Sequence, residues 1–222
     1  SENGPLVAAR SSAIHEGTTA TSYAGQLETI LGVSGLDDLI TAVRACWMSL
    51  WSPRAVRYMR VHNVDPARNA VAVLFQSLVP ARTAGGALSR TPDDRIVLTA
   101  AWGLGPAVAQ GEVVPDRYVL RRDGPAVECV EPGHKDRLMT CSEAGVRWQA
   151  VRSDLITAPC LSESEAMALA RLVLRAESVM NFPVEVEWAL GDGGFELLQA
   201  RPIAVTTQRE EDHPRTDHSS LK

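Results

Sequence analysis

The feature that most constrains the fold lies near the C-terminus, where two stretches of alternating residues flank a glycine-rich turn. The first stretch covers residues 184–190, the turn is Gly-Asp-Gly-Gly at 191–194, and the second stretch covers residues 195–203. Apolar and polar residues that alternate with a period of two are typical of a half-buried β-strand, and Asp-Gly between two such strands is typical of a hairpin. We therefore predict an antiparallel hairpin with one apolar face and one polar face.

Four polar side chains can gather on one face of this hairpin. Residues two positions apart in a strand share a face, so Glu185 and Glu187 lie together on the first strand. Gln199 and Arg201 share a face of the second strand for the same reason. An odd loop or a bulge sets the two pairs on a common face, with Glu185 opposite Gln199 for the odd loop, whereas an even loop turns the second strand over. We predict the odd loop or a bulge, because it also keeps the apolar side chains in the core.

The polar face of the hairpin would then carry two carboxylates, an amide and a guanidinium. Mg²⁺ usually takes one or two carboxylates together with phosphate and water oxygens, and an arginine fork binds phosphate oxygens in a bidentate manner. These side chains suit the phosphate end of a nucleotide. The spacing alone also fits the solvated, charged face of an ordinary hairpin, which is the commoner meaning of an isolated Glu-x-Glu.

Composition limits the classes of protein to which the chain can belong. Its 222 residues, 45% of them hydrophobic and 22% charged, are typical of a soluble globular protein with one sizeable core. A net charge of −5 argues against a nucleic-acid partner, because such proteins usually carry a basic patch. No apolar stretch approaches the roughly 20 residues that span a bilayer, and the first residues lack a signal-peptide pattern. The cysteines include no C-x-x-C pair, so we expect reduced thiols in a cytoplasmic protein without a membrane partner.

The N-terminal part predicts a short buried strand at residues 6–9, which runs into Arg-Ser-Ser-Ala at residues 10–13. The following loop, residues 14–25, is rich in Thr, Ser, Ala and Gly. Such a loop can bind an anion through its backbone N–H groups, or it can be an ordinary surface loop. Residues 25–31 are predicted to be extended.

Two helices follow. The first begins at Ser34 and carries apolar residues at helical spacing as far as Trp51, so Trp47 and Trp51 are expected in the core. Pro53 ends or restarts this helix, and a second helix is predicted over about residues 54–62.

A buried strand is predicted at residues 70–79. Its end, which includes Gln76, Leu78 and Val79, can present backbone amides to an adenine edge, or it can be a plain strand end. Lys135 is interpreted as a solvated charge. Neither the G-x-G-x-x-G nor the G-x-x-x-x-G-K-[ST] pattern of nucleotide-binding loops is present. Further strands are expected at 84–88, 95–101, 118–121, 126–130, 137–141 and 147–151.

Near the C-terminus, Ser162 and Glu165 form a capping box that begins a helix running to about Met180, with Val179 on its apolar side. Residues 206–222 are polar and charged without periodicity, and we expect a disordered tail. The folded domain is accordingly expected to span residues 1–205.

Six segments stand out for their order and spacing: RSSA at 10–13, SYAGQLET at 22–29, RACWMSLW at 44–51, WGLG at 102–105, PDRY at 115–118 and LLQARPI at 197–203. Together they resemble the ATP-binding domain of phosphoenolpyruvate synthase, pyruvate phosphate dikinase and the related rifamycin phosphotransferases. The resemblance covers about residues 6–205.

The resemblance implies an ATP-grasp fold, an α+β architecture with mostly antiparallel sheet and packed helices, in which two subdomains hold ATP between them. It also implies kinase-type phosphoryl or pyrophosphoryl transfer with ATP and Mg²⁺. The family's glycine loop, which covers the phosphates, falls on residues 22–26 with Gly25 at the turn. Nucleotide contacts then fall on Arg10, Ser22, Gly25, Gln26, Gln76, Leu78, Val79, Glu185, Gln199 and Arg201, metal ligands on Glu187, Gln199 and Glu185, and phosphate-neutralising catalytic charges on Arg10 and Arg201.

The chain also departs from the family pattern. Family members carry an additional N-terminal region with a nucleotide-contacting lysine, a swivelling domain with a phosphohistidine, and a substrate domain. None of the five histidines here lies in a T-x-H-G-G-type segment. We therefore expect these parts, and the phosphate acceptor, to come from another domain or from a second chain. The alternative hypothesis is a non-catalytic module that binds a nucleotide or a partner protein.

Overall fold

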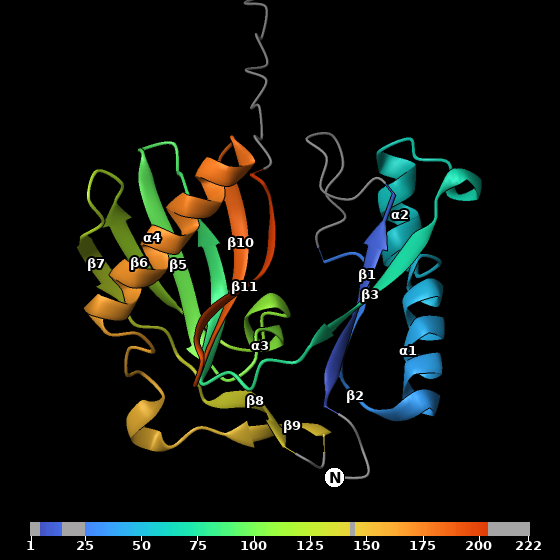
Figure 1. Ribbon diagram of the computed structural model, residues 1–222, viewed down its shortest axis with the longest axis horizontal. Coiled ribbons are helices and arrows are strands. Elements are labelled where there is room, and N and C mark those ends of the chain that lie inside the picture. The colour runs from blue at the N-terminus through green and yellow to red at the C-terminus, as the bar shows by residue number, and fades with distance from the viewer. Residues whose placement is uncertain (1–4, 15–24, 143–144, 204–222) are drawn as a thin grey trace, which may run out of the picture.

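Two lobes, each built on its own antiparallel sheet, make up the part of the chain that the computed structural model describes, residues 5–14, 25–142 and 145–203 (Figure 1). The elements of the N-terminal lobe are β1 (Val7–Ala13), β2 (Thr29–Val33), α1 (Gly35–Ser49), α2 (Pro53–Val61), a 3-10 helix (Pro66–Arg68) and β3 (Val71–Ser77). The strands lie in the order β2-β1-β3, and α1 and α2 pack against one face of this sheet.

The C-terminal lobe is larger. Its elements are β4 (Thr83–Leu88), β5 (Arg95–Trp102), α3 (Pro106–Ala109), β6 (Asp116–Arg121), β7 (Val127–Glu131), β8 (Arg137–Ser142), β9 (Gly145–Ala150), a 3-10 helix (Ser153–Leu155), α4 (Glu163–Met180), β10 (Val184–Gly191) and β11 (Gly194–Pro202). Six strands form a sheet in the order β11-β10-β4-β5-β6-β7, and α4 lies across one face of it (Figure 1). This mixture of helices and antiparallel sheets confirms the predicted α+β class.

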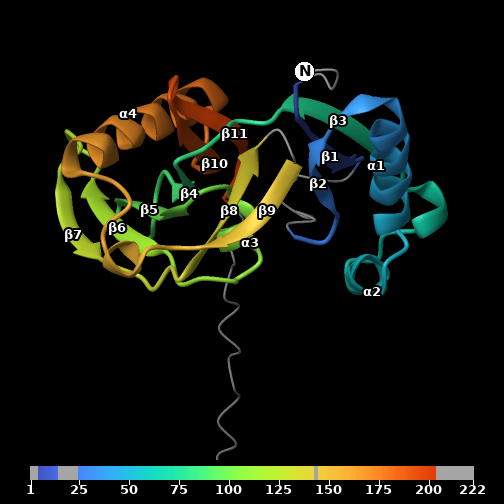
Figure 2. The same cartoon turned by 90° about the horizontal axis from the view of Figure 1, so that it is seen from below.

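The hairpin β8–β9 lies between the two lobes when the molecule is seen from below (Figure 2). Gly32 of β2 packs against it so closely that a Cβ atom at this position would lie 2.7 Å from Val146 Cγ2. Gly32 also has a φ of +74°, which side chains other than glycine rarely adopt. This contact therefore requires glycine. None of the helices in the described ranges is long and apolar enough to cross a bilayer.

The core of the C-terminal lobe lies between its sheet and α4. Val186 and Trp188 of β10 are fully buried against Leu169 and Val173 of α4. Burying a large apolar side chain contributes about 1.5–3 kcal/mol. The alternating pattern of β10 thus commits one face of the strand to the core and leaves the other for function.

A two-residue turn, Asp192-Gly193, joins β10 to β11, and Gly194 after it has a φ of 103°. The regular pairing from this turn is interrupted by a bulge, because Trp188 pairs with Leu197 whereas the preceding residue of β10 pairs with residue 199. Leu198 is therefore the extra residue. An even turn and a one-residue bulge together have the same parity as an odd loop.

The predicted common face of the hairpin is confirmed, with the bulge rather than the odd loop as its cause. Glu187 pairs with Gln199, and Glu185 pairs with Arg201. The placement of Glu185 opposite Gln199, which the odd loop would give, is wrong. The even turn with its bulge moves the pairing by two residues relative to the odd loop, and a shift of two keeps the same side chains on each face.

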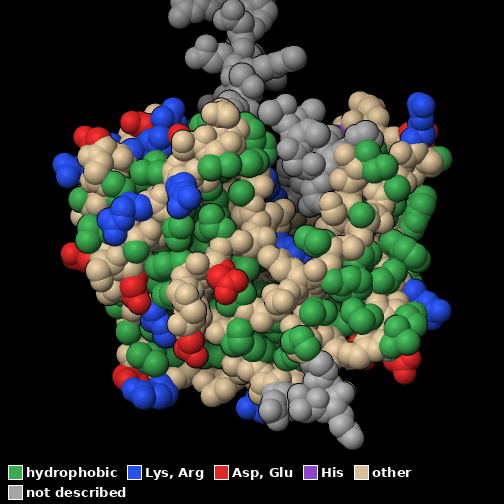
Figure 3. Space-filling model, in the orientation of Figure 1, with side chains coloured by type: hydrophobic (Ala, Val, Ile, Leu, Met, Phe, Trp, Pro, Cys, Tyr) green, Lys and Arg blue, Asp and Glu red, His purple; other side chains and the backbone are tan. Residues whose placement is uncertain are grey.

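The outer side of α1 differs from the prediction. Leu36 and Trp47 of α1 are 72% and 55% exposed, and Trp51, which follows the helix, is 60% exposed, although both tryptophans were expected in the core. Hydrophobic side chains accordingly gather on the surface over α1 (Figure 3). The buried side of the helix is instead formed by Ala42 and Cys46. The apolar residues of α1 extend around more of its circumference than the sheet covers, and spacing alone does not tell which part is covered.

The strand β3 is at the edge of its sheet and is not buried as predicted. Leu74 is 57% exposed and Phe75 is 41% exposed, since β3 pairs only with β1. In the C-terminal half, the capping box of Ser162 and Glu165 is confirmed, but Val179 in the last turn of α4 is 72% exposed and lies off the packed side.

The interpretation of Lys135 as a solvated charge is wrong. Its side chain is completely buried and forms an ion pair with Asp116, which is completely buried as well. The carboxylate of Asp116 also accepts hydrogen bonds from the backbone N–H groups of Gly133 (2.8 Å) and Cys160 (2.7 Å). The pair therefore joins β6 to the segment before β8 and to the segment before α4.

Candidate functional site

The polar face of β10 and β11 points away from α4. Because Val186 and Trp188 face α4, the intervening Glu187 must lie on the opposite face of the sheet. Its strand partner Gln199 shares that face, as do Glu185 and Arg201. The alternation of the sequence thus presents four polar side chains on the face of the sheet opposite α4.

A second polar position comes from the N-terminal lobe. In β1, Ala9 packs under α1, so the next residue, Arg10, points to the opposite face of the three-stranded sheet. Leu74 and Gln76 of β3 lie on the same face, because Leu74 pairs with Arg10 and Gln76 pairs with Ala8. The helix-free faces of the two sheets therefore carry all of these polar groups.

Arg10 joins the two faces. Its Nη2 donates a hydrogen bond to Glu187 Oε2 at 2.6 Å and a second, short one to Gln199 Oε1. The Arg10 side chain is only 17% exposed, whereas that of Glu187 is 46% exposed. The contact is therefore partly open to solvent on the Glu187 side, and it spans 177 positions of sequence.

A parallel ion pair lies one step along the hairpin. Arg201 Nε donates a hydrogen bond to Glu185 Oε2 at 3.1 Å, and Arg201 Nη2 lies 3.0 Å from Glu185 Oε1, so the two groups form a close ion pair. The charges of two guanidinium groups and two carboxylate groups thus cancel within the site. Incoming phosphates would compete with the carboxylates for the arginines, and an incoming cation would compete with the arginines for the carboxylates.

The oxygen atoms that Arg10 contacts are of the type that Mg²⁺ prefers. Glu187 and Gln199 each direct a side-chain oxygen at one cation, the guanidinium, so a metal ion could take the same oxygens. Within the described ranges no group of three or more His, Cys, Asp and Glu side chains is arranged to hold a metal. A site of one or two carboxylates and an amide suits a metal that takes its remaining ligands from phosphates and water, not one held by protein alone.

The proposed adenine-side residues lie where the chain passes between the lobes. Leu78 donates its backbone N–H to Leu6 O at 3.0 Å and so continues the strand pairing of β3. Val79 and Pro80 then pass the end of the hairpin, where a Cβ atom on Gly191 would lie 3.4 Å from Val79 Cγ1. Gln76 faces the same side as Arg10. The connection between the lobes therefore borders the face that carries the polar site.

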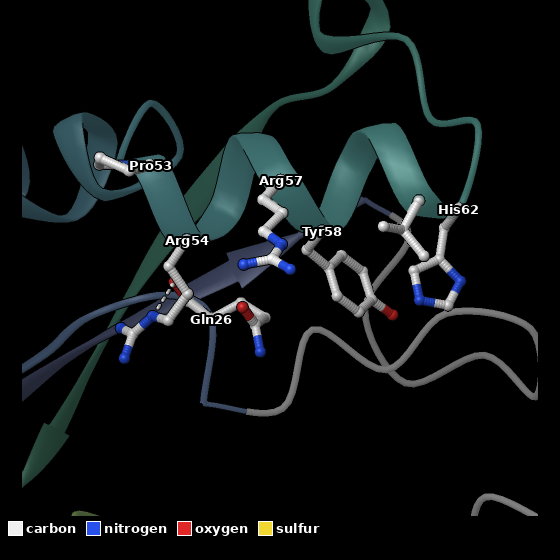
Figure 4. A pocket seen from close by; sticks show the side chains of 7 residues that line it. Gln26, Pro53, Arg54, Arg57, Tyr58 and His62 are labelled. Atoms are coloured by element: carbon white, nitrogen blue, oxygen red, sulfur yellow. Dashed lines mark hydrogen bonds between the residues drawn. The ribbon is translucent and has the colours of Figure 1, made fainter.

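The predicted glycine loop lies mostly outside the described residues, and Ser22 is among those not described. Gly25 has a φ of 63°, as expected for glycine at a turn. Gln26 lies beside α2, where it lines a depression together with Arg57 and Tyr58 (Figure 4). The structure thus brings Arg10, Glu187 and Gln199 into direct contact, and it places Gln26 against α2.

Arg54 is a residue that the sequence analysis did not single out. Its guanidinium donates to the backbone oxygen of Gln26 at 3.3 Å and to Glu28 Oε1 at 3.2 Å, and thereby attaches the end of the predicted glycine loop to α2. These contacts could not be predicted from its position in the first turn of a helix, because the partners are 26 and 28 positions away.

Comparison with known proteins identifies the family of the chain. The family model described as the pyruvate phosphate dikinase AMP/ATP-binding domain matches residues 1–221. A probable phosphoenolpyruvate synthase from Methanothermobacter thermautotrophicus is 34% identical over 209 residues, which cover 93% of this chain and 31% of that protein. An uncharacterized phosphotransferase, YvkC, from Bacillus subtilis is 31% identical over 206 residues, and covers 91% of this chain and 25% of its own length.

A third relative is named for a different product. The prodigiosin synthesizing transferase PigC of Serratia marcescens is 34% identical over 214 residues, which cover 93% of this chain and 23% of that protein. The chain spans less than a third of the length of each of these relatives. What they share with it is the nucleotide-binding part that the family model describes, and the chain belongs to the pyruvate phosphate dikinase AMP/ATP-binding domain family.

Proposed function

We propose that the chain binds MgATP between its two lobes and holds the phosphates for transfer to an acceptor on another domain or chain. The observation that carries the proposal is the contact of Arg10 in the N-terminal lobe with Glu187 and Gln199 in the C-terminal lobe. Phosphates and a divalent cation are the ligands that would satisfy these groups when the guanidinium and the carboxylate separate.

Each side chain would have a distinct task. Arg10 and Arg201 would bind phosphate oxygens and balance the negative charge that moves during transfer. Glu187 and Gln199, with Glu185 beside them, would hold Mg²⁺, which neutralises phosphate charge when bound. Phosphoryl transfer depends mainly on positioning and electrostatic stabilisation, so this chain needs no covalent nucleophile of its own.

The acceptor of the phosphoryl group would lie outside this chain. The relatives are more than three times as long as the region they share with this chain, and we propose that a histidine or substrate carried by such additional sequence, or by a second chain, receives the phosphoryl group. A non-catalytic nucleotide-binding module would have the same site. Adding a histidine-bearing domain of a relative and following ATP by ³¹P NMR separates the two, because only the catalytic module would consume ATP.

Thermal unfolding with and without MgATP tests the binding site. Ligand at about 100 times its Kd stabilises the folded state by about 2.7 kcal/mol, which raises the Tm of a chain of this size by about 5–10 °C. Glu187→Gln removes the carboxylate that Arg10 contacts, and the shift should largely disappear. Glu196→Gln, at an exposed position of the same hairpin, is the matched control and should keep the full shift. An equal shift in both variants would refute the site.

A further inference from the structure

A basic face of α2 lines the depression in which Gln26 lies (Figure 4). The residues that α2 contributes recur at helical spacing and therefore share one face of the helix. Figure 4 shows the side chains of Arg54, Arg57 and Tyr58 projecting from the same side of α2 toward the segment that carries Gln26. The depression measures about 450 Å³, and its helical lining is Pro53, Arg54, Arg57, Tyr58, Val61 and His62.

The charge of this face is opposite to that of the chain as a whole. Residues 53–64 contain three arginines and no acidic residue, whereas the whole chain has a net charge of −5. Arg54 is paired with Glu28 at 3.2 Å, but no acidic side chain of the described ranges forms an ion pair with Arg57. Two guanidinium groups three positions apart repel each other on a helix, so an anion between them would relieve the repulsion.

The rest of the lining is apolar or aromatic. The rings of Tyr58 and His62 lie with their centroids 4.2 Å apart, and Val61 beside them is 69% exposed. A ring pair made of the half-buried Tyr58 and the exposed His62, next to two guanidinium groups, suits a ligand with a planar part and an anionic part. A phosphate alone would use only the cationic end of the depression.

We propose that this depression binds a small organic phosphate, a phosphate monoester whose oxygens contact Arg54 and Arg57 and whose planar portion lies against Tyr58 and His62. Its volume falls within the range of small-molecule sites, about 300–1,000 Å³. The site is separate from the Arg10–Glu187 contact and does not rest on MgATP binding there. Because Arg54 also contacts Gln26 O, occupation of the depression would reach the end of the predicted glycine loop.

Phenyl phosphate is a suitable probe, because it combines a ring with a phosphate monoester. Titrations of the full chain, followed by NMR of the backbone and side-chain amides, should shift the signals of Gln26 and of α2. Inorganic phosphate should bind more weakly than phenyl phosphate, and sodium chloride at equal ionic strength should give no saturating shift. A saturating shift with chloride, or equal affinity for the two phosphates, would overturn the proposed ligand class.

Arg57 and Arg60 provide a matched pair of variants, because Arg57 lines the depression and Arg60 does not. Arg57→Gln should weaken phenyl phosphate binding about tenfold or more, as expected for the loss of a charged hydrogen bond. Arg60→Gln, which does not line the depression, should change the affinity less than about twofold. The converse ranking, or no binding at all to the unaltered chain, would refute the site. Loss of binding in Arg10→Gln but not in Arg57→Gln would assign the probe to the space between the lobes instead.

Discussion

Arg10 of β1 and Glu187 of β10 are joined by a 2.6 Å ion pair that connects the two lobes across 177 positions of sequence. Each residue is fixed by its own strand, because its neighbours in the alternating pattern face the helices of its lobe. The distance between the two side chains therefore depends on the relative position of the two sheets, each of which packs against the helices of its own lobe.

We expect Arg10→Gln to loosen the contact between the lobes. A partly exposed pair of this kind contributes about 1 kcal/mol or less to stability, so urea denaturation should show a small loss. A double-mutant cycle with Glu187→Gln isolates the pair itself. Arg171→Gln, on the exposed side of α4, serves as the control. A coupling energy of zero would mean that the pair does not hold the lobes together.

The buried ion pair should be far more sensitive. Lys135→Met leaves the completely buried Asp116 without its cation, and removing one partner of a buried pair costs about 3–5 kcal/mol. For a chain of this length that corresponds to a fall in Tm of about 6–20 °C. A loss below about 1 kcal/mol in chemical denaturation would contradict the burial of the pair.

Amine-reactive labelling gives an independent check of the same residue. Lys135 and Lys222 are the only lysines in the sequence. Lys135 should be protected from acylation in the native protein and should react after denaturation, because its ammonium group is completely buried. Peptide mapping by mass spectrometry identifies the modified position.

Acid should weaken the attachment of α4 at Glu177. Partial burial acts to raise the pKa of Glu177, but hydrogen bonds from Arg122 and Ser89 and the charges of Arg122 and Arg90 outweigh it, so its pKa lies below the ordinary value of 4.5. The folded state thus binds this proton less readily than the unfolded state does. The stabilisation is complete above about pH 4.5 and is lost as the pH falls through the lowered pKa.

The corresponding measurement is the free energy of unfolding between about pH 3 and pH 6. Glu177→Gln should flatten the acid limb of this curve, whereas Glu196→Gln should leave its shape unchanged. An unchanged acid limb in Glu177→Gln would mean that the pair with Arg122, at 2.8 Å, contributes nothing through its charge.

Thiol labelling should separate the four cysteines, all of which are free. Cys129 is exposed and should react at once with a thiol-specific disulfide reagent. Cys160 is buried, and burial together with the neighbouring Asp116 raises the pKa of its thiol, so it should react only on unfolding. Rapid native-state labelling of Cys160 would show that the segment before α4 opens readily.

The faces of the hairpin could be predicted from sequence because alternation with a period of two is a local property. The exact partners of Glu185 and Glu187 could not, since one extra residue at Leu198 shifts the register and leaves no signal in the pattern. The exposure of Trp47 was missed for a different reason. Helical spacing identifies the apolar side of α1, but only the tertiary structure determines how much of that side the sheet covers.

The burial of a charged residue could not be predicted from local sequence either. In the sequence Lys135 looks like a surface residue, because its partner Asp116 is 19 positions away. The two residues meet only when β6 and β7 have paired. The candidate site was more accessible to sequence reasoning, because Glu185, Glu187, Gln199 and Arg201 come from one hairpin. Arg10 was associated with them by family resemblance, and its contact with Glu187 depends on the packing of two sheets.

The passage from β3 to β4 has a consequence for how the protein folds. Within the described ranges the chain crosses between the lobes once, at residues 78–82, so each lobe is formed by a continuous run of sequence. Units of this kind usually fold separately, the N-terminal one first during synthesis. The three-stranded sheet can therefore be complete before β10 and β11 have left the ribosome, and the pairing of Arg10 with Glu187 becomes the final step, in which two finished lobes dock.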